Sequence, residues 1–298
     1  MRKLDSKTRA LIIRLLVEGS SIRATARIAD VSKNTVNKLL IDAGKACEKF
    51  HDERVRNVKA SVIQCDAVWS FTYAKAENVA TAKAEPEGAG DTWTWTALDS
   101  ETKMIVSYMV GGRDGEYAIG FMDDLRSRLA NRVQFTSNGQ RAYLEAVEDA
   151  FGGDVDDAQL IKIYGGATGQ QGHEKKYSPA ECTGTKKQRV EGSPDPARVS
   201  TSHVERQNLT MRMHMRRVTR LTNAFSKKVE NHAHAVALHF MYCNFVHVHQ
   251  TLKVTPAMAA GLTDRLWDIA DLVALIDANE TAPKKRGPYK KRNQQISK

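Results

Sequence analysis

The segment TSHVERQNLTMRMHMRRVTRL (residues 201–221) carries acidic and basic side chains at a spacing that could hold a metal ion beside a phosphate. Four apolar residues recur at helical intervals and predict a helix: Val204, Met211, Met215 and Val218. Glu205, Arg212 and Arg216 are seven and four residues apart, so they would share a second face of that helix. One carboxylate followed by two guanidinium groups suits a site that binds a cation and orients a phosphate backbone.

Glu205 has a second interpretation. Ser202 and Glu205 match the S-x-x-E pattern of a capping box, in which the glutamate satisfies a free backbone amide at the start of a helix. This segment alone leaves both interpretations open, so the rest of the chain has to decide between them.

A second acidic residue stands where an acid is unusual. In ASVIQCDAVWSFTYAK (residues 60–75) the side chains alternate with a period of two, which predicts a strand with Asp66 in its middle. Aspartate is depleted from strand interiors because it packs poorly there. We therefore expect Asp66 to be in the strand for a functional reason.

The order of the predicted elements brings three polar residues together. After the Asp66 strand come a hairpin over residues 92–112, a helix, a strand ending at Asn138, another helix and another strand. We interpret the Gly-, Pro- and Lys-rich residues 165–200 as a long loop before the Glu205 helix. In an open mixed sheet these positions can converge on one edge. Oxygen ligands without a Cys or His cluster suit two Mg²⁺ or Mn²⁺ ions, which would act on a phosphodiester.

The N-terminal residues predict a DNA-binding head. A helix over residues 7–18 ends at Gly19, a short helix follows from Ile22 to Ile28, and Ser32 caps a third helix. Helix, tight turn and capped helix form the helix-turn-helix pattern. Its exposed face would present residues that bond to bases and phosphates: Lys33, Asn34, Thr35, Asn37 and Lys38. The alternative is a plain three-helix bundle for protein contacts. The charged residues 45–59 predict a linker helix.

The composition agrees with a polyanionic partner. The chain of 298 residues has a formal net charge of +10, and a strongly basic protein most often binds nucleic acid. Four scattered cysteines indicate a reducing compartment, and the absence of a signal peptide or long apolar run predicts a cytoplasmic protein without a membrane partner. The tail has six basic residues in nine: Lys284, Lys285, Arg286, Lys290, Lys291 and Arg292. A general phosphate contact explains this tail better than a minor-groove arm.

The sequence resembles a known family, the DDE transposases of bacterial insertion sequences, family one. The similarity includes the helix-turn-helix, CDAVWSF, FTSNGQRAYLEAVEDAFG, the long segment STSHVERQNLTMRMHMRRVTRLTNAFSKKVENH and VTPAMAAGL. The resemblance implies an α/β, RNase H-like mixed-sheet catalytic core and DNA strand cleavage followed by strand transfer. It further implies that Asp66 is the first catalytic carboxylate and Glu205 the third, with Arg212 contacting DNA.

The chain departs from the family at the second acid. The family has a T-[ST]-D-G turn, and this chain has Thr136-Ser137-Asn138-Gly139. Asparagine keeps the shape and one acceptor oxygen but lacks the charge that holds a divalent cation. Three explanations remain open: an inactivated variant, a decayed natural copy, or slow deamidation of the Asn-Gly step. The resemblance thus implies a transposase in which catalysis is impaired.

The resemblance also implies an organisation and a set of partners. We expect a head over residues 1–58, a catalytic domain over 59–262, and a C-terminal helix with the basic tail over 263–298. The partners would be double-stranded DNA, as terminal inverted repeats and target, and further copies of the chain in a dimer or larger assembly. In the cell we expect a nucleoid-associated protein. The rivals are a DNA-binding regulator with an inactive core and a structure-selective nuclease of the same fold.

Other candidate ligands have simpler explanations. Asp99 fits the turn of the 92–112 hairpin better than a metal site. Glu148 and Asp149 fit a solvated helix face, and Cys182 with His173 lacks further ligands at zinc-like spacing. Five histidines look like a metal cluster but would not face one another on a helix, so we interpret them as core or DNA-facing: His232, His234, His239, His247 and His249.

Overall fold

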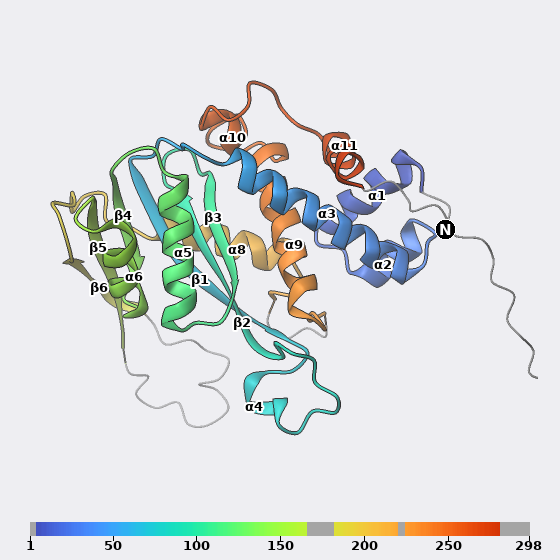
Figure 1. Cartoon of the computed structure of the whole chain (residues 1–298), viewed down its shortest axis with the longest axis horizontal. Helices are drawn as coiled ribbons and strands as arrows, with labels where there is room; N and C mark the ends of the chain where they lie inside the picture. Colours follow the sequence, from blue (N-terminus) through green and yellow to red (C-terminus); the bar gives the residue numbers. More distant parts are fainter. Residues whose placement is uncertain (1–3, 166–181, 220–223, 281–298) are drawn as a thin grey trace, which may run out of the picture.

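A six-stranded sheet lies at the centre of the computed structural model, which describes residues 4–165, 182–219 and 224–280 (Figure 1). Its strands are β1 (Val62–Thr72), β2 (Gly90–Asp99), β3 (Ile105–Gly111), β4 (Val133–Asn138), β5 (Val155–Tyr164) and β6 (Cys182–Arg189). The order across the sheet is β3-β2-β1-β4-β5-β6. The basic tail residues Lys284 to Arg292 and His173 lie outside the described residues.

The sheet is mixed because of how its strands are connected. β1, β2 and β3 pair antiparallel, and the predicted hairpin turn joins β2 to β3. β1, β4 and β5 pair in parallel, which requires crossover connections. α5 (Gly115–Arg128) and α6 (Ala142–Phe151) provide those crossovers. The expected α/β mixed-sheet core is confirmed.

The long loop predicted over residues 165–200 is wrong in part, because β6 lies within it and pairs antiparallel with β5. The sequence CTGTKKQR has no apolar alternation, and nearly every residue of β6 is exposed. An edge strand of this kind takes its stability from backbone pairing, and its lysines protect the edge from further strands. Because β6 has no buried face, its sequence shows no alternation of apolar and polar residues from which a strand could be predicted.

Helices cover both faces of the sheet. On one face the ring of Trp95 contacts Phe121 of α5 and Tyr143 of α6, with centroids 5.8 and 5.4 Å apart. On the other face the side-chain oxygen of Gln64 accepts hydrogen bonds from the first amides of α8 (Ser202–His214), those of His203 and Val204. The remaining helices are α1 (Ser6–Val17), α2 (Ile22–Ile28), α3 (Lys33–Arg54), α4 (Ala76–Val79), α9 (Val229–Met241), η1 (Tyr242–Val246), α10 (Pro256–Ala259) and α11 (Ile269–Asn279).

The three N-terminal helices begin where the sequence places them. The Ser21 and Ser32 side chains accept hydrogen bonds from the amides of Ala24 and Thr35 and cap α2 and α3. The predicted linker helix is instead the second half of α3, which runs unbroken to Arg54 and lies beside α9 (Figure 1). The DNA-binding role of these helices and the three domain boundaries remain predictions.

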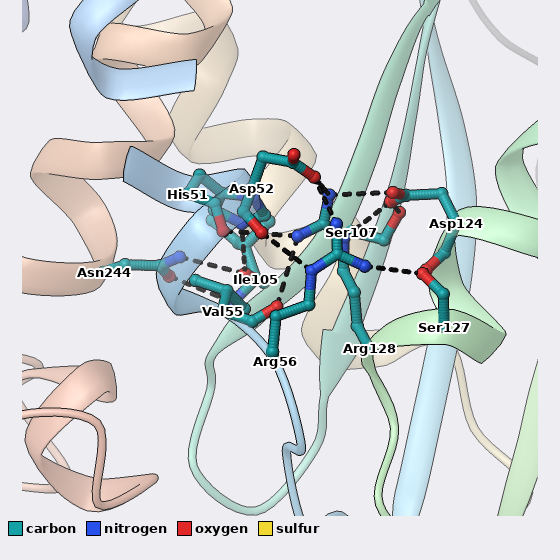
Figure 2. A network of polar contacts seen from close by, with 10 residues as sticks. All are labelled: His51, Asp52, Val55, Arg56, Ile105, Ser107, Asp124, Ser127, Arg128 and Asn244. Carbon is teal, nitrogen blue, oxygen red and sulfur yellow. Dashed lines mark hydrogen bonds and ion pairs between the residues drawn. The ribbon is translucent and has the colours of Figure 1, made fainter. Parts of the chain in front are cut away.

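A buried polar network attaches the end of α3 to the sheet (Figure 2). Arg128 of α5 is 5% exposed and donates to both carboxylate oxygens of Asp124. It also donates to the carbonyl oxygens of His51 and Val55 at the C-terminus of α3, and to the carboxylate of Asp52. Arg128 therefore caps α3 from another element.

The predicted Glu205 helix is shorter in the structure. It ends at His214 instead of continuing to residue 221, and Arg216 and Val218 lie in the turn that follows it. α9 continues as the π-helical turn η1, which ends at Val246. Among the described residues, no helix is long and apolar enough to cross a membrane.

Candidate active site

Asp66 lies in the middle of β1, on the face that α8 covers, and borders an open cavity of about 720 Å³. Both oxygens of its carboxylate accept hydrogen bonds from side-chain amides. Asn138 Nδ2 donates to Oδ1 at 2.7 Å, and Asn208 Nδ2 donates to Oδ2 at 2.9 Å. Burial raises the pKa of Asp66 above its usual range, and the nearby carboxylate of Glu205 raises it further.

Glu205 borders the same cavity from the first turn of α8. Its carboxylate accepts from Lys162 Nζ of β5 and from the hydroxyl of Thr201, each at 2.5 Å. Burial lowers the pKa of Lys162, but its hydrogen bond and charge interaction with Glu205 outweigh burial and raise that pKa above the usual value. The first turn of α8 thus places a negative charge beside a cation from the sheet.

The capping-box interpretation of Glu205 is wrong. The N-cap of α8 is Thr201, Ser202 lies within the helix, and the N-cap side chain makes no capping hydrogen bond. The Ser202 amide, which such a box would satisfy, donates instead to the Ser200 hydroxyl. The next two amides, those of His203 and Val204, donate to Gln64, two residues before Asp66 on the same face of β1. Gln64 therefore positions Glu205 relative to Asp66, by fixing the start of α8 on the strand.

Asn138 is at the end of β4, in the turn that the sequence predicts. Its Oδ1 accepts a hydrogen bond from the amide of Gln140 at 3.2 Å, so the acceptor that shapes the turn is retained. Its Nδ2 points at Asp66. An aspartate here would place a second negative oxygen against Asp66, and the amide removes that repulsion.

These side chains do not fit the expected pair of divalent ions. In residues 4–165, 182–219 and 224–280 there is no group of three or more His, Cys, Asp or Glu side chains that could hold a metal. Two carboxylates are present, and their oxygens already accept from Asn138, Asn208, Lys162 and Thr201. Ions of this kind need negatively charged oxygen ligands, and amide and ammonium donors stand in their place.

Residues 185–247 match the family model of the IS1 transposases. The resemblance to IS1-type DDE transposases is thereby confirmed. The matched segment contains α8 with Glu205 and Asn208, and all of α9 and η1. Asp66 and Asn138 lie outside it, so their family roles remain predictions.

Two solved structures of another transposase are similar to parts of the chain. They are a pre-cleavage Mos1 transpososome (13% identity, TM-score 0.21, 53% of this chain and 60% of that chain) and a Mos1 transposase paired-end complex with the left transposon end (14%, 0.19, 50% and 58%). The chain thus spans about three fifths of the length of these transposases. No curated protein matches it.

The structure separates the two arginines of the IS1-type Glu205 segment. Arg212 lies on α8, seven residues beyond Glu205 as predicted. Arg216 lies beyond the end of α8, where its Nε donates to the carbonyl oxygen of Gly19 at 3.2 Å. The predicted single face of three residues is therefore wrong at Arg216, because the helix ends two residues before it.

The other candidate ligands have structural roles. The Asp99 carboxylate accepts from the amides of Glu101 and Thr102 and from the Thr102 hydroxyl, which confirms its place in the hairpin turn. His232 and His239 are buried, and burial lowers the pKa of each to about 3, so both are neutral core residues. Lys33, Asn34 and Lys38 of the predicted DNA-reading face are exposed, while Thr35 and Asn37 are half-buried.

Sequence reasoning missed four residues around the pair of carboxylates: Gln64, Lys162, Thr201 and Asn208. Two of them had a readable signal. Asn208 is three residues after Glu205 and so shares its helix face, and Gln64 shares the strand face of Asp66. Lys162 could not be found this way, because its contact with Glu205 depends on the pairing of β5 with β4.

Proposed function

We propose that this chain is an IS1-type DNA transposase that binds the terminal inverted repeats of its element. In this proposal α1 to α3 bind the repeat, and the cavity bordered by Asp66, Asn138 and Glu205 is the site of strand cleavage and strand transfer. The observation that carries the proposal is that Asp66 on β1 and Glu205 on α8 border one cavity, with Glu205 inside the segment that matches IS1 transposases. The exposed side chains of Arg113 and Arg141 border the same cavity and could contact a phosphodiester.

The reaction proposed is hydrolysis of a phosphodiester by water, followed by attack of the freed 3′-hydroxyl on a second strand. Because the side chains present do not fit two divalent ions, cleavage by this chain should be weak or absent. We propose that Asn138→Asp supplies the missing carboxylate and with it a dependence on Mg²⁺ or Mn²⁺.

The test is a paired assay of cleavage and strand transfer on labelled element-end duplex in Mn²⁺, with this chain and with Asn138→Asp. We expect both proteins to bind the duplex and only the aspartate form to cut and join it. Glu205→Gln in the Asn138→Asp background is the control, and it should abolish the restored activity. Binding without cleavage by both forms would overturn the assignment of Asn138 as the second position.

A second candidate function is a DNA-binding regulator that uses the same head and an inactive core. The hydrogen bond from Asn138 to Asp66 favours it, because it satisfies the pocket without any cation. Binding of end DNA by the natural chain without cleavage, together with no gain by Asn138→Asp, would establish this alternative. Cleavage without strand transfer would instead identify a structure-selective nuclease.

Strand transfer joins two DNA ends, so the working unit should contain two or more copies of the chain. Sedimentation of the protein on end duplex should therefore show a dimer or larger complex. A monomer both on end DNA and on strand-transfer product would contradict this.

A further inference from the structure

A second cavity, of about 780 Å³, lies at the C-terminal end of α8, whereas Glu205 is in the first turn of that helix, and it is not part of the Asp66 pocket. It is bordered by the first residues of α2 and α3, by the turn that follows α8, and by the residues just before α9. Two contacts join these parts. Nδ1 of His214 lies 3.2 Å from the carbonyl oxygen of Val17, and Arg216 donates to the carbonyl oxygen of Gly19. We call this cavity the head cleft.

The turn after α1 packs closely against the C-terminal end of α8. Gly19 has a φ of +85°, and a Cβ atom at this position would lie 3.2 Å from the carbonyl oxygens of both Met213 and His214. A side chain here would thus be strained and would press on the backbone at the end of α8. The close approach fixes the N-terminal helices against the same helix that carries Glu205.

The head cleft is strongly positive. Five cationic side chains border it: Arg23, Lys33, Arg216, Arg217 and Lys227. No Asp or Glu is among its lining residues in the part of the chain that the structure describes. Neutral groups that can donate hydrogen bonds, such as Ser20 and Asn34, complete the lining. A cleft of this charge attracts an anion.

Arg217 brings a half-buried guanidinium to the head cleft. Its guanidinium donates to the Ser226 hydroxyl and to the backbone oxygen of Asn231. Among the described residues it forms no ion pair with a carboxylate. Burial lowers the pKa of Arg217 to about 10, so it remains charged at neutral pH. A charge taken out of water without a counter-ion is unfavourable, and a bound phosphate would supply one.

We propose that the head cleft binds the sugar–phosphate backbone of the DNA duplex that the head recognises. This inference rests on the proposed function and names a contact site for its DNA. Lys33, Asn34 and Asn37 of the predicted reading helix border the cleft, so one duplex can touch α3 and the turn after α8 together. His214 is nine residues beyond Glu205, about 14 Å along the helix. DNA in the head cleft would therefore contact the C-terminal end of α8, the helix that carries Glu205.

The chain offers matched pairs of residues for the test. Arg23 and Arg27 are both exposed on α2, and only Arg23 borders the cleft. Lys227 and Lys228 are exposed neighbours, and only Lys227 borders it. The experiment measures the affinity of the full chain for a labelled duplex of arbitrary sequence over a range of salt concentrations. It compares Arg23→Ala with Arg27→Ala, and Lys227→Ala with Lys228→Ala.

Each cleft variant should bind about three- to tenfold more weakly at moderate salt and lower the salt slope by about 1, because one phosphate contact is lost. Arg27→Ala and Lys228→Ala should leave both quantities unchanged. Equal effects within both pairs would overturn the head cleft as a DNA site. Displacement of the duplex by poly-glutamate of matched charge, at the concentration at which unlabelled duplex displaces it, would also overturn it and indicate an acidic protein partner.

The two proposals fail in different ways. The cleft is tested on duplex of arbitrary sequence, because backbone contacts carry no sequence information. If the paired variants differ but end DNA is neither preferred nor cut by Asn138→Asp, the cleft stands and the transposase proposal falls. If end DNA is preferred and cut while the pairs do not differ, the transposase proposal stands without the cleft.

Discussion

The Arg128 network and the Asp66–Glu205 pocket both bring carboxylates together beside the sheet, but they balance the charge differently. Asp124 accepts from Arg128 and Ser107, and although burial raises its pKa, these hydrogen bonds outweigh burial and lower the pKa below the usual value. Asp66 accepts only from neutral amides and lies near Glu205, so its pKa is raised. The first region surrounds a buried cation with its carboxylates, whereas the second bonds Asp66 with amides and places it near another carboxylate at an open cavity.

This contrast separates a structural cluster from a candidate active site by physical criteria. In Figure 2 the guanidinium of Arg128 donates hydrogen bonds to backbone carbonyls at the end of α3 and to the carboxylate of Asp124 on α5. All of these partners belong to the protein. In the pocket, the carboxylates border an open cavity together with basic side chains. A carboxylate with a raised pKa at a cavity, as Asp66 is, is typical of sites where a substrate or ion binds.

The largest effect should come from Arg128→Met. Removing this buried cation leaves Asp124 with the Ser107 hydroxyl but no cation, and takes a donor from the carbonyl oxygens of His51 and Val55. We therefore expect a loss of about 3–5 kcal/mol in the free energy of unfolding. Urea denaturation measures it. Arg126→Met is the matched control, because Arg126 is on the same helix, 39% exposed and paired with Asp154; its loss should stay below about 1 kcal/mol. Similar losses for the two variants would contradict the structural role of the network.

The next effect tests whether a raised pKa alone marks a functional residue. Asp157 on β5 is 2% exposed, its Oδ1 has no hydrogen-bond partner among the described residues, and burial raises its pKa from 3.8 to about 7. As the pH rises from about 4 to 7, the unfolded chain releases this proton and the folded chain keeps it, so stability is lost over that window. Asp157→Asn should therefore raise the free energy of unfolding at pH 8, by at most about 4 kcal/mol, and leave it unchanged below pH 4.

Asp156 provides the control with the opposite sign. Its hydrogen bonds from Arg132 and from the amide of Ser193 lower its pKa, so its contribution to stability is present at neutral pH and lost as the pH falls. Asp156→Asn should thus destabilise at pH 8 and have no effect at low pH. If Asp157→Asn raises the free energy of unfolding at pH 8, the Asp157 carboxyl destabilises the fold, and its raised pKa does not mark a functional residue.

A smaller effect should follow from Asn138→Asp in the absence of metal. The substitution replaces the donor to Asp66 with a carboxylate, so we expect a loss of about 1–3 kcal/mol in EDTA. Mn²⁺ should then raise the melting temperature of the variant, by mass action, and leave the natural chain unchanged. Asn131→Asp is the control, because Asn131 donates to the carbonyl oxygen of Ala60, away from the pocket; its melting temperature should not respond to Mn²⁺. A response of the natural chain to Mn²⁺ would contradict the filled pocket.

The sheet and the helices were predictable where one face of each element is buried. The strand around Asp66, the hairpin at Asp99 and the helix cap at Ser32 follow from alternation, turn chemistry and capping, all of which are local. β6 was missed because an exposed edge strand shows no such pattern. The end of α8 at His214 was missed because the turn that follows is held by contacts with Val17 and Gly19, nearly two hundred residues away.

The candidate site was predictable only in part, for the same reason. The acids Asp66 and Glu205 stood out by residue type and position, and the structure brings both to one cavity. Their partners come from other elements: Lys162 from β5, Asn138 from β4 and Gln64 from β1. Which of these side chains meet depends on strand order and register, and local spacing carries no information about that.

Lys162→Gln should have the smallest effect on the free energy of unfolding. It tests whether the cation of the Asp66–Glu205 pocket, unlike Arg128, contributes little to the stability of the fold. The Lys162 ammonium and the Glu205 carboxylate are 33% and 37% exposed, so solvent screens their ion pair and the loss of stability should be below about 1 kcal/mol. In the Asn138→Asp background, removal of this cation should instead strengthen Mn²⁺ binding several-fold, because Glu205 becomes free to act as a ligand.

Lys187→Gln on β6 is the control, since its Nζ contacts the backbone oxygen of Pro196 and no carboxylate among the described residues. Calorimetry of unfolding and of Mn²⁺ binding measures both quantities. A loss above about 2 kcal/mol in the free energy of unfolding would contradict this and would show that Lys162, like Arg128, mainly stabilises the fold.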